Sequence, residues 1–199
     1  MNVTLLTKQE HFADMEHFAA LAALTCHANT EKDFVPAEVL RRIIKLGHES
    51  VLEHINLTYS VKGLSRACLH ELERHRHISL SVESTRHTLR KQLNDKVALS
   101  RISKGASGEW LKAIENVKRI ADTFTDTPND ELKYFLPEFW PTNLILTSNI
   151  RELRHIINLR TAPQALKEFR DLAHKLFNVV PEKFKYLLQD CVHQEVNNG

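Results

Sequence analysis

The densest group of residues able to do chemistry lies between Arg74 and Arg86. Arg74, His75 and Arg76 follow one another, and Ser84 and Arg86 come a few residues later in the chain. Guanidinium groups bind phosphate oxygens through paired hydrogen bonds, and serine hydroxyls can complete the shell around an anion. Basic residues in the last turn of a helix also occur because they stabilise its negative end. The added serines favour an anion-binding site.

The charge distribution around this group agrees with a small anionic ligand. The net charge of the chain is only +2, but Lys62 to Lys91 holds seven Lys/Arg against three Glu, and four of the twelve histidines. Such a local focus suits a small anion better than a long nucleic-acid track. The chain has only five glycines, in positions that form no Gly-x-Gly-x-x-Gly or Walker loop. Side chains must therefore hold the phosphates of any bound nucleotide.

A second polar cluster contains Asn149, Arg151, Arg154, His155 and Arg160. Arg151 and His155 are one turn apart and share a face of the helix expected there. The backbone amides at the helix start, near Asn149, would be a natural partner for phosphate. A solvated basic face is an equally good reading of this cluster taken alone.

Two other chemistries fit these residues less well. The histidines could ligate a metal ion, but His75 and His77 share a face only in a strand, and no His-Glu-x-x-His pattern is present. We therefore predict no metal site. Ser84 could be a nucleophile only with an activating base within hydrogen-bond reach. The sequence identifies no such base, so we predict that this hydroxyl binds ligand.

Hydrophobic periodicity predicts the elements that position these residues. Strands are expected at 3–7, 57–61 and 78–83, the last presenting Ser79, Ser81 and Glu83 on one face. Helices are expected at 10–28, 36–47, 65–75, 108–125, 128–136, 150–160, 163–178 and 181–191, with an irregular loop at 94–107. Short strands mixed with many helices, without regular βαβ alternation, indicate an α+β fold.

Two of these helices have recognisable start signals. Asn149 with Glu152, and Thr161 with Gln164, each resemble a capping box, in which a polar side chain and a residue three positions later satisfy free backbone amides. We expect the helices at 150–160 and 163–178 to begin there.

The length and composition place the chain among ordinary globular proteins. Its 199 residues match a single domain over 1–199, at roughly 100–200 residues per domain. The 42% hydrophobic and 26% charged fractions are typical of such domains. No stretch approaches the roughly 18 apolar residues of a membrane span, and the N-terminus has no signal-peptide pattern. Three scattered cysteines do not form a disulfide framework. We expect a cytoplasmic protein with no membrane partner.

The segment Arg74-His75-Arg76, then seven residues, then Ser84 resembles the RHR-x7-S signature of flavin-dependent thymidylate synthases. Other blocks resemble the same family in the same order along the chain. These blocks are GHESVLEH at 47–54, SRACLHELERHRHISLSVESTRHTL at 65–89, LKYFLP at 132–137 and NLRTAPQA at 158–165. The block at 65–89 contains the first polar cluster, and the block at 158–165 contains Arg160 of the second.

The resemblance implies reductive methylation of dUMP to dTMP. In that reaction 5,10-methylenetetrahydrofolate donates the carbon, reduced FAD donates the hydride, and NADPH reduces the flavin again. It also implies a homotetramer, built around a mixed β-sheet with surrounding helices, whose active sites are shared between chains. The partners would be these small molecules, with no nucleic acid. The alternative is a basic module that binds RNA or phosphate without catalysis and holds no flavin.

The resemblance also assigns ligand contacts by matching positions. The implied FAD contacts are His48, Ser50, Glu53, Arg74, His75, Arg76, Ser81, Val82, Asn149, Arg151 and His155. The implied dUMP contacts are Glu71, Arg74, Glu83, Ser84, Thr85, Arg86, Lys133 and Arg160. Arg160 matches the catalytic residue that polarises or ionises the uracil at N3, and a positioned guanidinium suits charge developing on a pyrimidine. Other thymidylate synthases add a cysteine thiolate to the ring, but none of the three cysteines here lies in a motif that matches that nucleophile, so we expect a route without one.

Four positions depart from the residues that are commoner in the family. Glu71 stands in place of Gln, Val82 in place of Glu or Gln, His87 in place of Tyr, and Lys133 in place of Arg. At Val82 only a backbone contact is expected, and Lys133 lacks the bidentate fork of an arginine.

Overall fold

The computed structural model describes residues 1–26, 28, 33–95 and 108–193. Its strands are β1 (Asn2–Leu5), β2 (Asn56–Ser65), β3 (Ile78–Val82) and β4 (Pro141–Asn149). Its α-helices are α1 (Gln9–Thr25), α2 (Pro36–Lys45), α3 (Arg66–Leu72), α4 (Thr85–Asn94), α6 (Gly108–Thr123), α7 (Asn129–Leu132), α8 (Ile150–Arg160) and α9 (Lys167–Asn178). Short 3-10 helices are η1 (Glu49–His54), η2 (Lys133–Phe135), η3 (Glu182–Leu187) and η4 (Gln189–Cys191).

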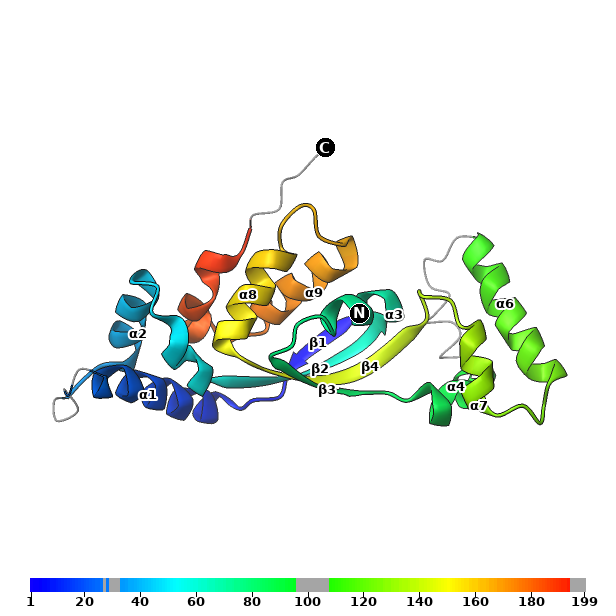
Figure 1. Ribbon diagram of the computed structural model, residues 1–199, viewed down its shortest axis with the longest axis horizontal. Coiled ribbons are helices and arrows are strands. Elements are labelled where there is room, and N and C mark those ends of the chain that lie inside the picture. Colours follow the sequence, from blue (N-terminus) through cyan, green and yellow to red (C-terminus); the bar gives the residue numbers. More distant parts are fainter. Residues whose placement is uncertain (27, 29–32, 96–107, 194–199) are drawn as a thin grey trace. The chain divides into compact units, whose positions relative to one another are not determined.

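The four strands form one sheet in the order β1-β2-β4-β3 (Figure 1). β1 pairs with β2 in the antiparallel sense. Just after β4, the Ile150 amide donates to the Ile55 carbonyl, just before β2, at 2.8 Å, so β2 and β4 are also antiparallel. Just after β3, the Glu83 amide donates to the Asn143 carbonyl near the start of β4, which makes the last pair antiparallel. The α+β class is confirmed, and the sheet is antiparallel where the resemblance led us to expect a mixed one.

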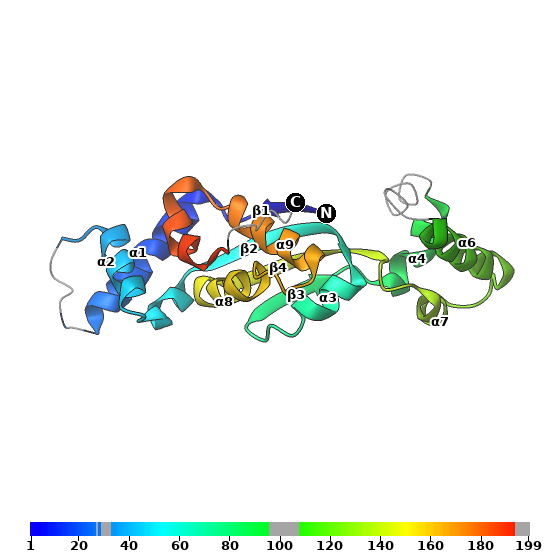
Figure 2. The same ribbon diagram turned by 90° about the horizontal axis from the view of Figure 1, so that it is seen from above.

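The chain forms two compact units, and β2, β3 and β4 each contribute to both. The first unit comprises Met1–Lys62, Cys68–Ser81 and Leu144–Gly199. Within it, helices α8 and α9 cover one face of the sheet (Figures 1 and 2). Leu153 of α8 and Phe169 of α9 are fully buried, and Phe12 of α1 stacks on Phe184 of η3 at 3.9 Å between ring centroids. This apolar packing fixes α8, the helix that carries the second polar cluster.

The second unit comprises Gly63–Ala67 and Val82–Asn143 and has a core of its own. Its centre is the fully buried Trp140, whose indole Nε1 donates to Gln92 Oε1 of α4 at 2.9 Å. Leu89 and Leu93 of α4 pack in the same cluster as Val117 of α6. This core holds α4, and with it the segment that starts at Ser84. No described helix is long and apolar enough to span a bilayer.

Most predicted elements are confirmed, with ends shifted by a few residues, but β4 and α4 were not predicted. In β4 the buried positions include Thr142 and Ser148 while Ile145 faces outward, so polarity does not follow burial along the strand. In α4 only Leu89 and Leu93 are buried, which is too short a stripe to detect among polar residues. The loop expected at 94–107 begins inside α4 and otherwise lies outside the described residues.

Other predicted helix boundaries are corrected. Asn149 caps α8 as expected, since its Oδ1 accepts from the Glu152 amide at 2.8 Å. The second capping box is wrong, because Thr161 closes α8 instead of starting the next helix. The Thr161 hydroxyl donates to the Ile157 carbonyl at 2.7 Å, and α9 begins only at Lys167. The helix expected at 181–191 is the pair of 3-10 helices η3 and η4, and the one at 65–75 ends at Leu72.

Candidate active site

An open, polar cavity of about 770 Å³ lies at the start of α8, inside the first unit. This volume falls within the range of roughly 300–1,000 Å³ that is typical of small-molecule sites. Its lining residues are Glu49, Glu53, His77, Asn149, Arg151, Glu152, Arg154, His155, Asn158, Asp190 and Cys191. The cavity therefore brings together the expected FAD contacts Glu53, Asn149, Arg151 and His155.

The best-defined pair on the cavity wall joins η1 to α8. Arg151 Nη1 donates to Glu53 Oε1 at 2.6 Å, and both side chains are about half exposed. An ion pair in contact with water contributes little to stability and can exchange partners with an incoming anion. His48 and Ser50 lie exposed at the start of η1, outside the lining of this cavity.

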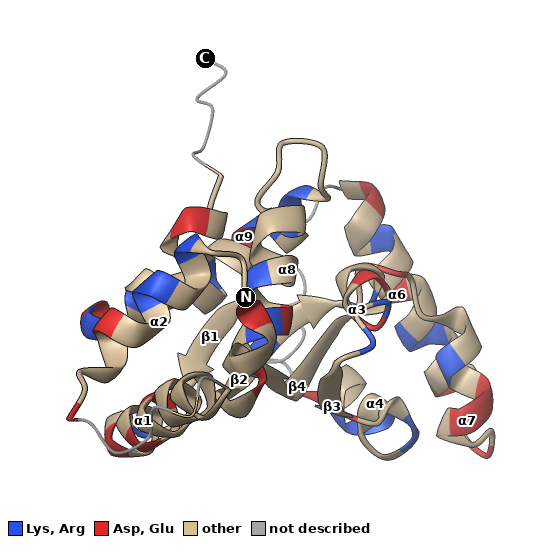
Figure 3. Cartoon of the chain, turned by 60° about the vertical axis from the view of Figure 1, so that its left-hand side comes forward, with Lys and Arg blue, Asp and Glu red and all other residues tan. Residues whose placement is uncertain are grey.

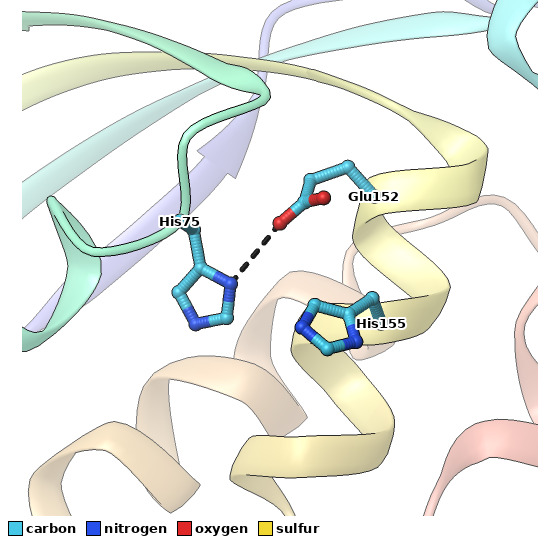
Figure 4. A group of neighbouring side chains, drawn as sticks. All are labelled: His75, Glu152 and His155. Atoms are coloured by element: carbon cyan, nitrogen blue, oxygen red, sulfur yellow. Dashed lines mark hydrogen bonds and ion pairs between the residues drawn. The ribbon is translucent and has the colours of Figure 1, made fainter.

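His75 is buried in the turn after α3, and its ring is hydrogen-bonded to two residues of α8, one of which, Glu152, is drawn in Figure 4. Its Nδ1 lies 3.0 Å from Glu152 Oε1, and its Nε2 lies 3.1 Å from Arg160 Nε. A guanidinium can only donate, so Nε2 must be the acceptor of that bond. The ring proton is therefore on Nδ1, which donates to Glu152. The ring of His155 lies 5.6 Å away, edge-on.

Arg160, the last residue of α8, is held on several sides. Besides its bond to His75, its Nη1 donates to Glu71 Oε2 at 2.9 Å and its Nη2 donates to the Glu71 carbonyl at 3.3 Å. Its guanidinium carbon lies 4.5 Å above the centre of the Phe169 ring. Arg74, which is largely exposed, lies 3.6 Å from the other Glu71 oxygen. The structure thus assembles four residues that the sequence assigned to ligand binding.

The environment of His75 keeps the imidazole neutral. Burial lowers the pKa of His75, and the Arg160 charge acts in the same direction, while the hydrogen bond to Glu152 opposes them. His75, Glu152 and His155 have ligand atoms within 4.8 Å of one another, a grouping that could hold a metal ion. A metal on Nδ1 would place a proton on Nε2, opposite the Arg160 Nε–H donor. The observed contacts of His75 therefore fit a hydrogen bond from Nδ1 to Glu152 better than a metal ion bound at Nδ1.

Arg154 belongs to the second polar cluster, but the structure makes it a packing residue. It is buried, and its guanidinium donates to both Asp190 oxygens at 2.7 Å, to Glu49 Oε1 at 2.9 Å and to the Leu187 carbonyl at 2.7 Å. Burial opposes the charged form, yet the hydrogen bond to Asp190 raises the pKa of Arg154. The same hydrogen bond lowers the pKa of Asp190. Arg154 therefore ties α8 to η4.

The second unit holds the remaining expected dUMP contacts near the start of α4. Ser84 is the N-cap residue of α4, and its carbonyl accepts from the Thr88 amide at 3.1 Å. Arg86 Nε lies 3.1 Å from one Asp130 oxygen, and Lys133 Nζ lies 3.3 Å from the other. Glu83, the residue before Ser84, accepts hydrogen bonds from the side chains of Gln92 and Asn143. Thr85 begins the helix itself.

The other expected FAD contacts lie along one stretch of chain. Arg76 is exposed in the turn between α3 and β3, Ser81 is exposed on β3, and Val82, the last residue of β3, is partly buried. Their side chains are not among those that line the cavity.

Two residues at these sites were missed by the sequence reasoning. The sequence identifies Glu152 only as part of a capping box, but its carboxylate lies 3.0 Å from His75 Nδ1. No local pattern reveals this, since the two residues are far apart in sequence. Asp130 precedes Lys133 by three residues on a helical segment, and that spacing of opposite charges could have identified the pair.

Comparisons with known proteins bear on what these groups do. Residues 7–184 match the family described as thymidylate synthase complementing protein. The chain is 36% identical over 192 residues to the flavin-dependent thymidylate synthase of Campylobacter jejuni (strain RM1221), covering 88% of this chain and 92% of that protein. This chain belongs to the flavin-dependent thymidylate synthases. It is also 38% identical over 159 residues to the family member from Helicobacter pylori (strain ATCC 700392 / 26695), covering 73% of this chain and 76% of that protein.

Solved structures of the family share this fold. A crystal structure of thymidylate synthase X from Helicobacter pylori with FAD and dUMP matches with a TM-score of 0.83 and 30% identity, covering 98% of this chain and 100% of that one. A second Helicobacter pylori structure, also with FAD and dUMP, matches with a TM-score of 0.82 and 32% identity over 97% and 100% of the two chains. The comparisons give no support to the alternative of a non-catalytic RNA- or phosphate-binding module.

The charges of the second unit also speak against a nucleic-acid track. Basic and acidic residues alternate along α6 (Figure 3). Two of its lysines pair within the helix, Lys112 with Glu109 at 2.8 Å and Lys118 with Asp122 at 3.2 Å. A surface that neutralises its own cations leaves few of them for a phosphate backbone.

Proposed function

We propose that this protein is a flavin-dependent thymidylate synthase that converts dUMP to dTMP. The observation that carries the proposal is the match, over nearly the whole chain, to enzymes of that name and to structures solved with FAD and dUMP. In this reaction C5 of the uracil loses a proton and gains a carbon from 5,10-methylenetetrahydrofolate. A hydride then completes the methyl group, and NADPH restores the reduced cofactor.

The expected cofactor contacts, of which Glu53, Asn149, Arg151 and His155 line the α8 cavity, fit FAD as the cofactor. Arg74, Arg76 and Arg151 provide charged donors for a diphosphate, which a chain without glycine loops needs. Bound to these residues and reduced by NADPH, the flavin would supply the hydride. We assign its remaining contacts to the matching positions His48, Ser50, Glu53, His75, Ser81, Val82, Asn149 and His155. Both ring nitrogens of His75 are already hydrogen-bonded, so it would meet the cofactor through its backbone or a ring face.

We assign dUMP to residues with two distinct tasks. Arg86, Lys133, Ser84 and Thr85 would hold the nucleotide, together with Glu71, Arg74 and Glu83. Arg160 would act on the uracil ring, where its fixed guanidinium can stabilise negative charge that develops on the pyrimidine. Its three neighbours hold the guanidinium before substrate arrives, so little reorganisation is needed during the reaction.

A route without a cysteine nucleophile fits the environment of the buried thiols. Burial raises the pKa of Cys68 to about 12 and that of Cys191 to about 11. Both thiols are therefore protonated at neutral pH, and the thiolate is the nucleophilic form. We propose that the uracil ring is activated by Arg160 alone.

We also propose a cytoplasmic homotetramer in which one active site takes residues from different chains. The positions assigned to the flavin and the nucleotide in these 199 residues must leave room for a folate as well. Sites of this kind often lie where two surfaces meet. Mixing Arg86→Ala chains with Arg160→Ala chains would restore about a quarter of the wild-type activity if these residues come from different chains. Verified hybrid tetramers that stay inactive would exclude the shared site.

The function is tested by tritium release from dUMP labelled at C5. Purified protein is incubated with FAD, NADPH and 5,10-methylenetetrahydrofolate, and labelled water and dTMP are both measured. We expect equal amounts of the two products, with dTMP absent when the folate is left out. A folded, flavin-loaded protein that forms no dTMP under these conditions would overturn the proposal.

A further inference from the structure

Glu152 carries a buried carboxylate, and the family resemblance assigns it no ligand contact. Its place on the cavity wall does not explain why the carboxylate is turned toward His75. Its side chain is only 10% exposed, and its carboxylate contacts the Nδ1 of His75, at 3.0 Å (Figure 4). Burying a carboxylate is costly unless it is hydrogen-bonded. The contribution of Glu152 to the cap of α8 is made by its backbone amide, which donates a hydrogen bond to Asn149 Oδ1. Capping therefore does not explain why its carboxylate is buried.

We propose that Glu152 is a positioning residue for the reaction and acts through His75 on Arg160. By accepting a hydrogen bond from Nδ1–H, Glu152 selects the His75 tautomer whose Nε2 can accept a hydrogen bond from Arg160 Nε. That second bond sets the orientation of the guanidinium. The inference rests on the proposed function, in which Arg160 acts on the uracil.

The geometry requires an intermediary. Glu152 and Arg160 both lie on α8, eight residues apart, which is about 12 Å along a helix axis. They are too far apart to touch, and His75, from the turn after α3, spans the gap. The rings of His155 and Phe169 have their centroids 5.6 and 5.9 Å from that of His75 and confine it. The hydrogen bond to Glu152 then decides which nitrogen faces Arg160.

The other contacts of Arg160 do not fix the orientation of its Nε–H, so this depends on the hydrogen bond to His75 Nε2. Glu71 holds the Nη1 and Nη2 end of the guanidinium, and Phe169 covers one face. The bond to His75 is the described contact at Nε and fixes rotation about the Glu71 end. Without the carboxylate, the His75 proton can move to Nε2. Two donors would then face each other, and Arg160 would turn away.

The central experiment compares Glu152→Leu with Glu152→Gln in the flavin-loaded enzyme. Leu removes the acceptor, and we expect kcat to fall on the order of tenfold to a hundredfold with little change in KM for dUMP. Gln keeps an acceptor oxygen for Nδ1–H, and we expect its kcat within about threefold of wild type. Glu16→Leu is the matched control, since Glu16 is also a partly buried carboxylate in the first unit that accepts one hydrogen bond, from the Tyr186 hydroxyl at 2.6 Å. It should keep wild-type kcat.

A double-mutant cycle separates positioning from a general structural effect. Arg160→Lys removes the Nε–H donor to His75, so adding Glu152→Leu to that variant should lower kcat no further. Effects that multiply would overturn the proposal, and so would a Glu152→Leu enzyme with unchanged kcat.

Nitrogen NMR of the labelled holoenzyme adds a signature that does not depend on activity. The His75 proton should lie on Nδ1 in wild type and in Glu152→Gln, and should leave Nδ1 in Glu152→Leu. The same Nδ1 signal in Glu152→Leu would refute the tautomer selection even if that variant folds poorly. If wild type makes no dTMP, the proposed function fails while this measurement still decides the role of Glu152.

Discussion

Two cations of the first unit, Arg154 and Arg160, differ from two of the second, Arg86 and Lys133, in how they are held. Arg154 and Arg160 have side chains that are 7% and 13% exposed, and each is fixed by several partners. Arg86 and Lys133 are 67% and 41% exposed and share the carboxylate of Asp130. Buried partners leave a charge few alternatives, whereas exposed pairs are weak and exchange readily. The first arrangement suits a group that must orient a reacting ring, and the second suits groups that must capture an incoming phosphate.

The largest effect should come from removing the buried guanidinium of Arg154. Arg154→Ala leaves Asp190 and Glu49 without their shared cation, and we expect about 3 kcal/mol of destabilisation. This is the lower end for a broken buried pair, because Asp190 is half exposed and can be hydrated. Urea unfolding followed by circular dichroism measures it. Arg119→Ala on α6, which loses only an exposed contact to Asn116, is the control and should change stability by less than about 0.5 kcal/mol. Equal losses in the two variants would contradict the comparison.

The next effect is on catalysis and concerns Arg160. Arg160→Lys keeps the charge but loses the planar fork, and with it the bond to His75 and the paired bonds to Glu71. We expect kcat for dTMP formation to fall about a hundredfold, as when a positioned donor is removed from an active site. The KM for dUMP should change much less. If only KM rises, Arg160 anchors the nucleotide and the division of roles between the two units is wrong.

Substitution of Arg86 should affect KM and not kcat, the reverse of Arg160→Lys, and the change should be smaller. Arg86→Ala removes an exposed guanidinium that we assign to the nucleotide, and we expect the KM for dUMP to rise about tenfold, the cost of one charge-assisted hydrogen bond. Its kcat at saturating dUMP should stay near wild type. Steady-state kinetics at two salt concentrations test this, since an exposed charge contact weakens with salt. A fall in kcat without a change in KM would contradict an anchoring role.

The buried histidine makes a weaker, pH-dependent contribution. Because burial lowers the pKa of His75 in the folded protein, the unfolded chain binds more protons below about pH 6.5, and stability should fall as the pH decreases through that value. One proton gives at most about 1.4 kcal/mol per pH unit. His75→Asn, which can still donate to Glu152, should flatten this slope between pH 7 and 5. Unchanged slopes would mean that His75 remains neutral in both states or is charged in both.

Structural features that depend on residues close together in the sequence could be predicted, whereas those that depend on distant residues could not. Local signals worked well: Pro36 starts α2, Asn149 caps α8, and Ile78 to Val82 alternates as a half-buried strand. Thr161 shows where a local signal fails. A Thr at a helix end can bond backward to the preceding helix as readily as forward to the next, and the downstream chain decided between them.

The residues of the site also differ in whether local sequence or only the tertiary fold reveals them. The Arg74 to Arg86 segment was identified because its residues are close in sequence, and the family resemblance extended the assignment to Arg160. The partners that define Arg160 come from three segments, with Glu71 in α3, His75 after it and Phe169 in α9. Only the tertiary fold brings them together. Both Arg151 and Arg154 line the cavity, and periodicity could not show that Arg154 is buried and held by several partners while Arg151 is half exposed.

The smallest effect should come from the exposed carboxylate that Arg86 and Lys133 share. Asp130→Asn removes the negative charge but keeps a polar side chain, and the pairs it breaks lie 3.1 and 3.3 Å apart at a solvent-exposed surface. We expect a stability loss of no more than about 0.5 kcal/mol, far below that of Arg154→Ala, because water replaces the lost partner. Asp130 also competes with a phosphate for the same two cations, so its neutralisation should lower the KM for dUMP by about twofold at low salt, with the difference vanishing as salt screens both charges. Urea unfolding and steady-state kinetics test the two expectations on one variant. A loss above about 1.5 kcal/mol, or a large rise in KM, would show that Asp130 is a fixed part of the site and that Arg86 and Lys133 are held as firmly as Arg154 and Arg160.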